Sequence, residues 1–105
     1  MKLIVLHRVW PALVQSAEWY QLQSEGLGAE FIDAVVALSD IVAQNPQHFP
    51  VVHLDARRAV MSRFPFGMYF VIRPDSIYVF AISHLHRNPK SWQRWIPKSR
   101  PHWKR

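Results

Sequence analysis

Arginine and histidine residues that could take part in chemistry occur at five positions in the second half of the chain: Arg58, Arg63, His84, His86 and Arg87. Guanidinium groups stay charged near neutral pH and can stabilise negative charge that develops in a reaction. Imidazole titrates near neutral pH, so it can move protons. His84 and His86 are two residues apart and would share one face of a strand, either as a paired site or as a rim over the core. These five residues form the candidate catalytic set, an active surface whose members are catalytic only if the protein is an enzyme.

Several of these positions also have a structural interpretation. Arg57 and Arg58 are adjacent and would point to opposite faces of a strand, so at least one of them is expected to be a solvated charge. Arg63 precedes a Phe-Pro sequence, and its stem could pack on the aromatic rings there. The two histidines have no nearby carboxylate beyond Asp75, which is an incomplete set of metal ligands. The sequence predicts no metal and no cofactor, and the absence of cysteine excludes a disulfide or a catalytic thiol.

A second group of candidates follows the last histidine, where tryptophans alternate with basic residues: Lys90, Trp92, Arg94 and Trp95. Such a mixture can stack on bases while it contacts phosphates. We therefore assign these four residues to binding of nucleic acid or another target. The alternative is that the tryptophans cover an edge of the core, and for Trp92 this alternative is favoured.

The charge of the chain is divided unevenly. The whole sequence carries a net charge of +6. Residues 1–55 contain two basic and six acidic side chains, a balance of −4, and residues 56–105 contain eleven basic side chains and one acid, a balance of +10. This asymmetry favours a polyanionic or acidic partner for the second half, and the alternative is a solvated basic face with a tail. The start of the chain lacks the features of a signal peptide, and no apolar run is long enough to cross a membrane, so a soluble cytoplasmic protein is expected.

The elements that must position these side chains can be predicted from the periodicity of apolar residues. A short buried strand is expected over 2–7. Two antiparallel helices should follow: the first has an apolar stripe of Trp10, Leu13, Val14, Ala17 and Tyr20 and ends at Gly26-Leu27-Gly28. The second has a stripe of Phe31, Val35, Leu38 and Val42 and ends at Asn45-Pro46. Strands are expected near 51–54, 57–63, 68–73 and 77–84, then a short helix at 90–95. The order of elements predicts an α+β fold in which the helical hairpin packs on one face of a mostly antiparallel sheet.

Two segments of the second half resemble the RelE/ParE superfamily of toxins. They are RRAVMSRFPFGMYFVI, residues 57–72, and IYVFAISHLHRNP, residues 77–89, followed by Trp92. The matching features are an arginine-bearing strand that runs into a Phe-Pro-aromatic turn, then an apolar hairpin that ends in a His-x-x-Arg-x-Pro-like sequence. Upstream, Asn45-Pro46 and Phe49-Pro50 after the helical hairpin match as well. The resemblance covers about residues 2–95, and it implies a single toxin domain over 1–95 with a basic tail over 96–105.

The resemblance implies two possible activities of a toxin from a type II toxin–antitoxin module, a group that includes plasmid stabilisation proteins. Members similar to RelE cleave messenger RNA on the ribosome without a metal, whereas members similar to ParE inhibit DNA gyrase. In our alignment Arg58 and Arg87 occupy positions where cleaving members carry basic residues, but Val60 and Gly67 occupy two others. His84 is similar to what ParE-like members carry, so ParE-like inhibition is slightly favoured over the endonuclease. A non-catalytic nucleic-acid-binding module is a further alternative.

The resemblance also implies partners. An acidic antitoxin, encoded by a neighbouring gene, is expected to fold against the toxin and cover its basic side chains. The cellular target is either DNA gyrase or the ribosome with its messenger RNA. Contact with operator DNA is expected only through the antitoxin.

Overall fold

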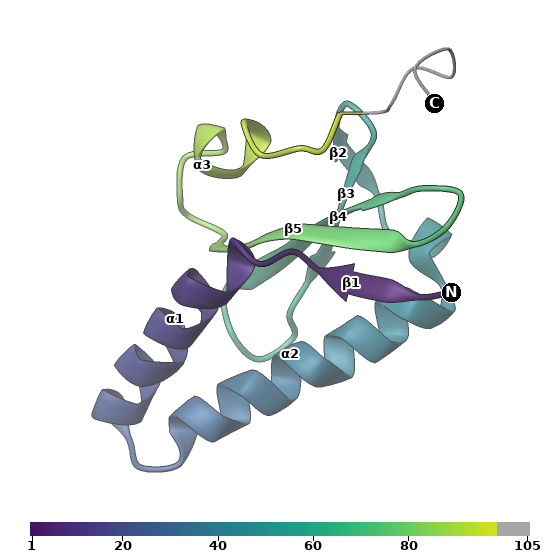
Figure 1. The fold of residues 1–105 in the computed structure, drawn as a ribbon. Coiled ribbons are helices and arrows are strands. Elements are labelled where there is room, and N and C mark those ends of the chain that lie inside the picture. Colours follow the sequence, from purple (N-terminus) through teal and green to yellow (C-terminus); the bar gives the residue numbers. More distant parts are fainter. Residues whose placement is uncertain (99–105) are drawn as a thin grey trace.

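The elements follow one another in the order strand, two helices, four strands and a final short helix (Figure 1). The computed structural model describes residues 1–98. Its elements are β1 (Leu3–Val5), α1 (Val9–Gln23), α2 (Leu27–Gln44), the 3-10 helix η1 (Pro46–His48), β2 (Val51–His53), β3 (Ala56–Val60), β4 (Phe66–Ile72), β5 (Ile77–His84) and α3 (Lys90–Gln93).

The five strands form one sheet in the order β1-β5-β4-β3-β2. β1 runs parallel to β5, and the three other pairs are antiparallel, so the prediction of a mostly antiparallel sheet is confirmed. β1 is shorter than the expected strand over 2–7, and it pairs only with residues 77–79 of β5. Among the described residues, the remainder of β5, residues 80–84, therefore has no neighbouring strand on the β1 side.

Both faces of the sheet are covered, but by different layers. Figure 1 shows the α1–α2 hairpin below the sheet and α3 with the following residues above it. On the hairpin side the core joins helical side chains such as Phe31 and Val42 to Met68, Phe70 and Val79 of the sheet. The opposite side has a smaller core made of Ala56, Tyr69, Val71, Phe80 and Trp92. The predicted α+β arrangement is confirmed, and the sheet also has a covered second face.

A β-bulge in β5 decides which side chains reach each face. Val79 pairs with Phe70 and Ala81 pairs with Tyr69, so Phe80 is an extra residue between two pairs. A bulge of this kind interrupts the strict alternation of a strand. Phe80 and Ala81 both pack with the smaller core, whereas Ile82 returns to the hairpin side. Cross-strand partners share a face, so His84, which pairs with Phe66, also lies on the hairpin side.

The predicted apolar stripe of the second helix is confirmed, but that of the first is partly wrong. Phe31, Val35 and Val42 of α2 are buried, and Leu38 packs against them. In α1, Leu13 is buried, but Trp10 and Val14 are 48% and 50% exposed. The physical reason is that α1 packs mainly on α2 and on β5, so only a narrow strip of its surface meets the core.

Of the two glycines in the hairpin turn, Gly26 has the role expected of a glycine at a tight reversal, and Gly28 does not. α1 ends at Gln23, with Ser24 as its C-cap, and Gly26 has φ of +87° immediately before α2 begins. Gly26 thus supplies the left-handed backbone of the turn, where glycine has no steric penalty. Gly28 lies inside α2 and does not end a helix. A Cβ atom there would lie 2.6 Å from the backbone oxygen of Ala17, so Gly28 permits close contact between the helices.

Replacing Gly28 with alanine is expected to lower the free energy of unfolding by about 1–2 kcal/mol. The new methyl group must displace the backbone of α1, at a cost of roughly 1–3 kcal/mol, and better helix propensity offsets at most about 1 kcal/mol of this. Urea unfolding followed by circular dichroism would measure the change. Ala29→Ser, at an exposed position of the same turn, is the matched control and should be nearly neutral. A Gly28→Ala variant as stable as the control would contradict the close contact.

Strand boundaries differ from the predictions around the Phe-Pro sequence. The expected strand over 57–63 ends in the structure at Val60, and β4 begins at Phe66 rather than at 68. The backbone N–H of Met61 donates to the carbonyl of Phe66 over 2.9 Å, and that of Phe66 donates to the carbonyl of Phe64 over 2.8 Å. A tight turn therefore occupies residues 61–65. Pro65 has no N–H to offer a strand ladder, which is consistent with the turn.

The segment after α3 continues along the sheet. Ile96 packs against the smaller core, and an Arg73 Nη2 group donates to the carbonyl of Pro97 over 2.8 Å. Residues 96–98, the start of the predicted tail, are thus held at the end of the sheet. The remainder of that predicted tail, residues 99–105, lies outside the described residues.

Candidate functional site

Three of the five candidate catalytic residues lie together at the end of β5. The rings of His84 and His86 are 5.3 Å apart between centroids. The backbone N–H of His86 donates to Nδ1 of His84 over 3.2 Å. Because Nδ1 accepts this bond, a neutral His84 carries its proton on Nε2. The ring of His84 is also 5.3 Å from that of Phe66, its cross-strand partner. The two rings lie close together as predicted, but His86 follows the end of β5 and lies in a turn, so the two residues do not share one face of a strand.

His84 and Arg87 line an open pocket of about 450 Å³ between α1 and the end of β5. The size is within the range of roughly 300–1,000 Å³ that is usual for ligand sites. Its other walls come from α1 and from the turn before β4: Ser16, Trp19, Tyr20, Pro65 and Phe66. Trp19 is 57% exposed. Tryptophan and arginine are both enriched among the residues that dominate binding energy at protein interfaces.

Arg58 lies on the opposite face of the sheet from His84. It pairs with Tyr69, whose ring belongs to the smaller core. Its stem covers Gly67: a Cβ atom on that glycine would lie 3.1 Å from Cδ of Arg58 and 3.2 Å from Leu85. Nε of Arg58 is buried and has no hydrogen-bond partner among the described residues. The structure therefore separates Arg58 from the histidines by the thickness of the sheet.

Arg63 is also placed away from the histidines, on the side of the helical hairpin. Its Nη1 group forms an ion pair with a carboxylate oxygen of Glu30 at 2.5 Å, and both side chains are about half exposed. The guanidinium carbon is 5.3 Å from the ring centre of Phe64, so the predicted packing near the Phe-Pro turn is also present. An exposed pair of this kind contributes about 0–1 kcal/mol. Arg63 thus has a local partner and does not face the His84 pocket.

The four residues assigned to target binding are divided between the core and the surface. Trp92 is 5% exposed and stacks on Tyr69, with ring centroids 4.2 Å apart. This is the core-edge alternative, and in this position its ring cannot stack on a base. Lys90 and Arg94 are exposed at the two ends of α3. Trp95 is 41% exposed, and it carries the Arg8 guanidinium on its ring. Binding of a target by Lys90, Arg94 and Trp95 stays a prediction.

Three residues have roles that the sequence did not indicate. Ser16 and Trp19 line the His84 pocket, although the apolar stripe of α1 indicates a role in the core. Trp19 lies outside the predicted apolar stripe, and a large aromatic residue off the buried face was the available signal. The sequence did not distinguish Arg57 from a solvated surface charge. Its Nη1 group instead donates to the carbonyl of Phe49 over 2.7 Å and holds the chain that leads into β2.

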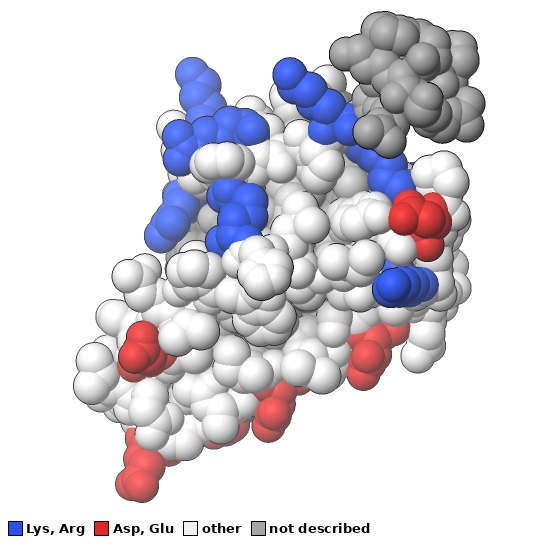
Figure 2. All heavy atoms as spheres, viewed as in Figure 1, with Lys and Arg blue, Asp and Glu red and all other residues white. Residues whose placement is uncertain are grey.

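The charge asymmetry of the sequence becomes a separation in space. Figure 2 shows lysine and arginine side chains gathered around α3 and the start of α1, and acidic side chains along the helical hairpin. Five of the six acids in residues 1–55 belong to the hairpin: Glu18, Glu25, Glu30, Asp33 and Asp40. Among residues 1–98 there is no group of three histidine or acidic side chains that could hold a metal ion. In the same part of the chain, no helix has the length and apolar character to cross a membrane.

A comparison with solved structures reveals a similar fold. A chain of the structure described as "Chromosomal ParDE TA system from P. aeruginosa", where TA stands for toxin–antitoxin, superimposes with a TM-score of 0.71 at 16% sequence identity. The match covers 80% of this chain and 95% of that chain. No protein-family model matches the sequence, and no curated protein matches it. The likeness confirms the predicted RelE/ParE-like fold.

Proposed function

We propose that this protein is the toxin of a type II toxin–antitoxin pair and that it acts as a ParE-like inhibitor of DNA gyrase. In this proposal it binds its target and cleaves nothing. It works in the cytoplasm, where gyrase acts on DNA. The RelE/ParE-like fold supports the toxin assignment. The position of the candidate cations supports inhibition by binding.

The main support for the proposal is that the candidate catalytic residues do not lie together but are divided between the two faces of the sheet. Cleavage of RNA by its own 2′-OH requires cations and a proton-transferring group around one phosphate. Here Arg58 and His84 lie on opposite faces, and Arg63 pairs with Glu30. On the face of Arg58, the resemblance places cations of cleaving members at the positions of Val60 and Gly67. Two missing donors, each worth on the order of 3 kcal/mol, amount to a rate loss of about 10⁴.

The surface at the end of β5 suits a protein target. Trp19, Tyr20 and Phe66 form an aromatic wall, and His84 and Arg87 add polar groups at its rim. Tryptophan, tyrosine and arginine are enriched among the residues that dominate binding energy at protein interfaces. The binding surface in this proposal therefore consists of Trp19, His84 and Arg87.

An acidic antitoxin is the partner that fits the charge distribution. The basic end around α3 attracts a negatively charged segment, and the acidic hairpin repels it. The first experiment is inducible expression of the whole chain in bacterial cells, with or without the neighbouring small acidic open reading frame. Expression alone should arrest growth, and coexpression should restore it. The proposal fails if no arrest occurs, or if no flanking gene relieves it.

The process that stops first separates the proposed target from the alternatives. Gyrase inhibition predicts double-strand breaks and an SOS response before protein synthesis falls. Rapid loss of protein synthesis with cleaved messages would instead support the RelE-like endonuclease. A protein that causes no arrest but binds arbitrary duplex DNA in a strongly salt-dependent way would be a plain nucleic-acid-binding module.

Substitutions at the binding surface are expected to weaken arrest, whereas removal of the Arg58 charge is not. His84→Ala and Arg87→Ala should each weaken target binding about thirtyfold, because a dominant interface residue contributes about 2 kcal/mol or more. Arg58→Met is the matched comparison, because it keeps a stem over Gly67 and removes only the cation. Growth under graded induction would report the effects. Loss of arrest in Arg58→Met, with full arrest in the other two variants, would favour the endonuclease.

A further inference from the structure

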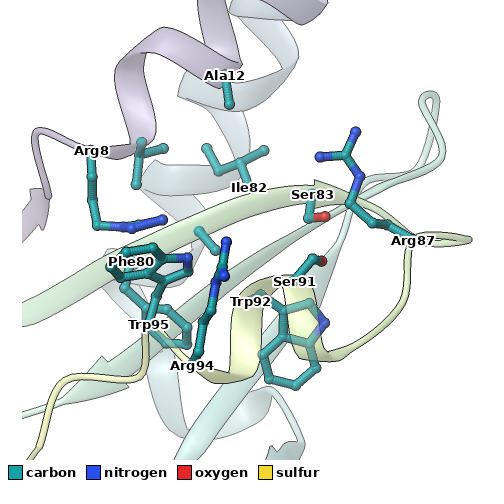
Figure 3. Close-up of a pocket in the computed structure, with 12 residues that line it drawn as sticks. Arg8, Ala12, Phe80, Ile82, Ser83, Arg87, Ser91, Trp92, Arg94 and Trp95 are labelled. Atoms are coloured by element: carbon teal, nitrogen blue, oxygen red, sulfur yellow. The ribbon is translucent and has the colours of Figure 1, made fainter.

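A second pocket lies where β5 has no neighbouring strand, between the start of α1 and α3 (Figure 3). Its volume is about 220 Å³, which is less than the roughly 300–1,000 Å³ of sites that enclose a whole small-molecule ligand. Its size suits one small group of a ligand. Arg87 stands between the two pockets and lines both, so this pocket is a neighbour of the His84 pocket and has its own walls.

Three arginines from separate segments line this pocket, and Figure 3 shows the Arg8 and Arg94 side chains on one side of β5 and the Arg87 guanidinium on the side of α1. Arg8 precedes α1, Arg87 follows β5 and Arg94 follows α3. Within residues 1–98 the lining contains no carboxylate, and none of the three arginines forms an ion pair. The pocket is therefore strongly cationic and has no internal counter-charge from the described part of the chain.

The contacts around Trp95 hold two of these cations close together. Figure 3 shows Arg8 lying across the ring of Trp95, with Arg94 beside it and pointing toward β5. The Cζ atoms of Arg8 and Arg94 are 3.3 Å and 5.1 Å from the centre of that ring. Burial, together with the charge of Arg94, lowers the pKa of Arg8. An anion placed between the two guanidinium groups would relieve their repulsion.

Two hydroxyl groups in the lining have hydrogen-bonding capacity that no described residue uses. Ser83 is only 8% exposed, and its Oγ is buried without a partner. Oγ of Ser91, at the start of α3, is also buried and has no hydrogen-bond partner among the described residues. Buried hydroxyls in proteins are nearly always hydrogen-bonded. Both hydroxyls can donate to an anion that also meets the arginines.

We propose that this pocket binds a phosphate group. The donors approach from the start of α1, from β5 and from α3, so the acceptor must offer oxygens in several directions. A tetrahedral phosphate does so, whereas a carboxylate presents two oxygens in one plane. The planar fork of arginine also matches phosphate oxygens in pairs. Arg87 is shared with the surface of the proposed function, but the test of this site is independent of that function, because it uses purified protein in which no gyrase or antitoxin is present.

The test uses the whole chain and inorganic phosphate as the probe. Titration calorimetry should show saturable binding of one phosphate per chain, and phosphate should raise the melting temperature. Arg94→Gln should weaken binding about tenfold to a hundredfold, because it removes charge-assisted hydrogen bonds. Ser83→Ala should weaken binding about twofold to tenfold. Without phosphate, Ser83→Ala should melt no lower than the parent protein, because the lost hydroxyl has no partner.

The matched control is Lys2→Gln, which removes one positive charge from an exposed position at the far end of β1. It should leave phosphate binding unchanged. Equal weakening by Lys2→Gln and Arg94→Gln would mean that only net charge matters, and this result would overturn the proposal. Absence of saturable phosphate binding would overturn it too. So would an acidic peptide that binds in an Arg94-dependent way and that phosphate does not displace.

Two further probes identify the source of the phosphate. A 5′-nucleotide monophosphate and a single-stranded RNA oligonucleotide are titrated against the parent protein and Arg94→Gln. Tighter Arg94-dependent binding of the RNA than of inorganic phosphate would assign the pocket to a nucleic-acid backbone. Binding of the nucleotide or the free ion as tight as that of the RNA would assign it to a small phosphate compound.

Discussion

Replacing Phe31 with alanine is expected to lower the free energy of unfolding by about 3–5 kcal/mol, the usual cost of removing a large aromatic side chain from a core. Phe31 is completely buried. Its ring centre is 5.2 Å from those of Tyr20 and Phe64 and 5.0 Å from that of Phe66. The cavity would lie where α1, α2 and the turn before β4 meet, and these elements cannot all move inward at once.

A loss of this size is a large fraction of the whole stability, since domains unfold with about 5–15 kcal/mol. Urea denaturation at equilibrium would measure it. Val36→Ala is the matched control, because Val36 lies in the same helix and is 54% exposed. Its loss should stay below about 1 kcal/mol. Equal losses in the two variants would mean that the aromatic cluster is not a rigid core. The His84 pocket shares two walls with this cluster, Tyr20 and Phe66, so Phe31→Ala should also weaken growth arrest.

Replacing Trp92 with alanine should cost about 3 kcal/mol, toward the lower end of the range for large aromatic residues. Trp92 is the main side chain that attaches α3 to the sheet, through its stack on Tyr69. The loss should be local, because α3 has only four residues and the hairpin side of the sheet keeps its own core. Amide hydrogen exchange should therefore become much faster in residues 90–96 and change little in α2.

The control for Trp92 is Lys90→Ala, which shortens an exposed side chain at the start of the same helix. It should leave both stability and exchange nearly unchanged. Uniform acceleration of exchange throughout Trp92→Ala would contradict the local interpretation. If the free energy of unfolding fell by less than about 1 kcal/mol, the stack of Trp92 on Tyr69 would add little to the attachment of α3. The contact of Arg8 with Trp95 and the hydrogen bond from Arg73 to the carbonyl of Pro97 would then be enough to hold this segment.

The elements that could be predicted from the sequence are those with a long, regular apolar pattern. The stripe of α2 and the continuous apolar run of β4 and β5 identified the hairpin, the central strands and the α+β order. The close position of His84 and His86 was predicted from a spacing of two residues on a strand, but His86 lies in the turn after β5, so the two rings meet for a different reason. These features depend on neighbours along the chain, and periodicity reports such neighbours directly.

The features that could not be predicted depend on contacts between distant segments or on a single irregularity. The bulge at Phe80 shifts the alternation of side chains between the two faces in β5, and no residue type near Phe80 indicates a bulge. The pair of Arg63 with Glu30 joins a turn to a helix. The phosphate pocket joins Arg8 to Arg94, which only the folded chain brings together. The division of the candidate residues between two faces likewise depends on the register of the strands, and register cannot be read from amino-acid composition.

The separation of acids and cations described above also has a consequence for the rate at which a partner arrives. The protein measures 51 Å along its longest axis, and at physiological ionic strength the field of a charge decays over about 8 Å. A polyanion close to α3 therefore hardly senses the carboxylates at the far end of the hairpin. The effective charge that this partner meets is therefore more positive than the net charge of +6 of the whole protein. The same field turns the molecule during approach, so the basic end meets the partner first, and association is faster than random collision would allow.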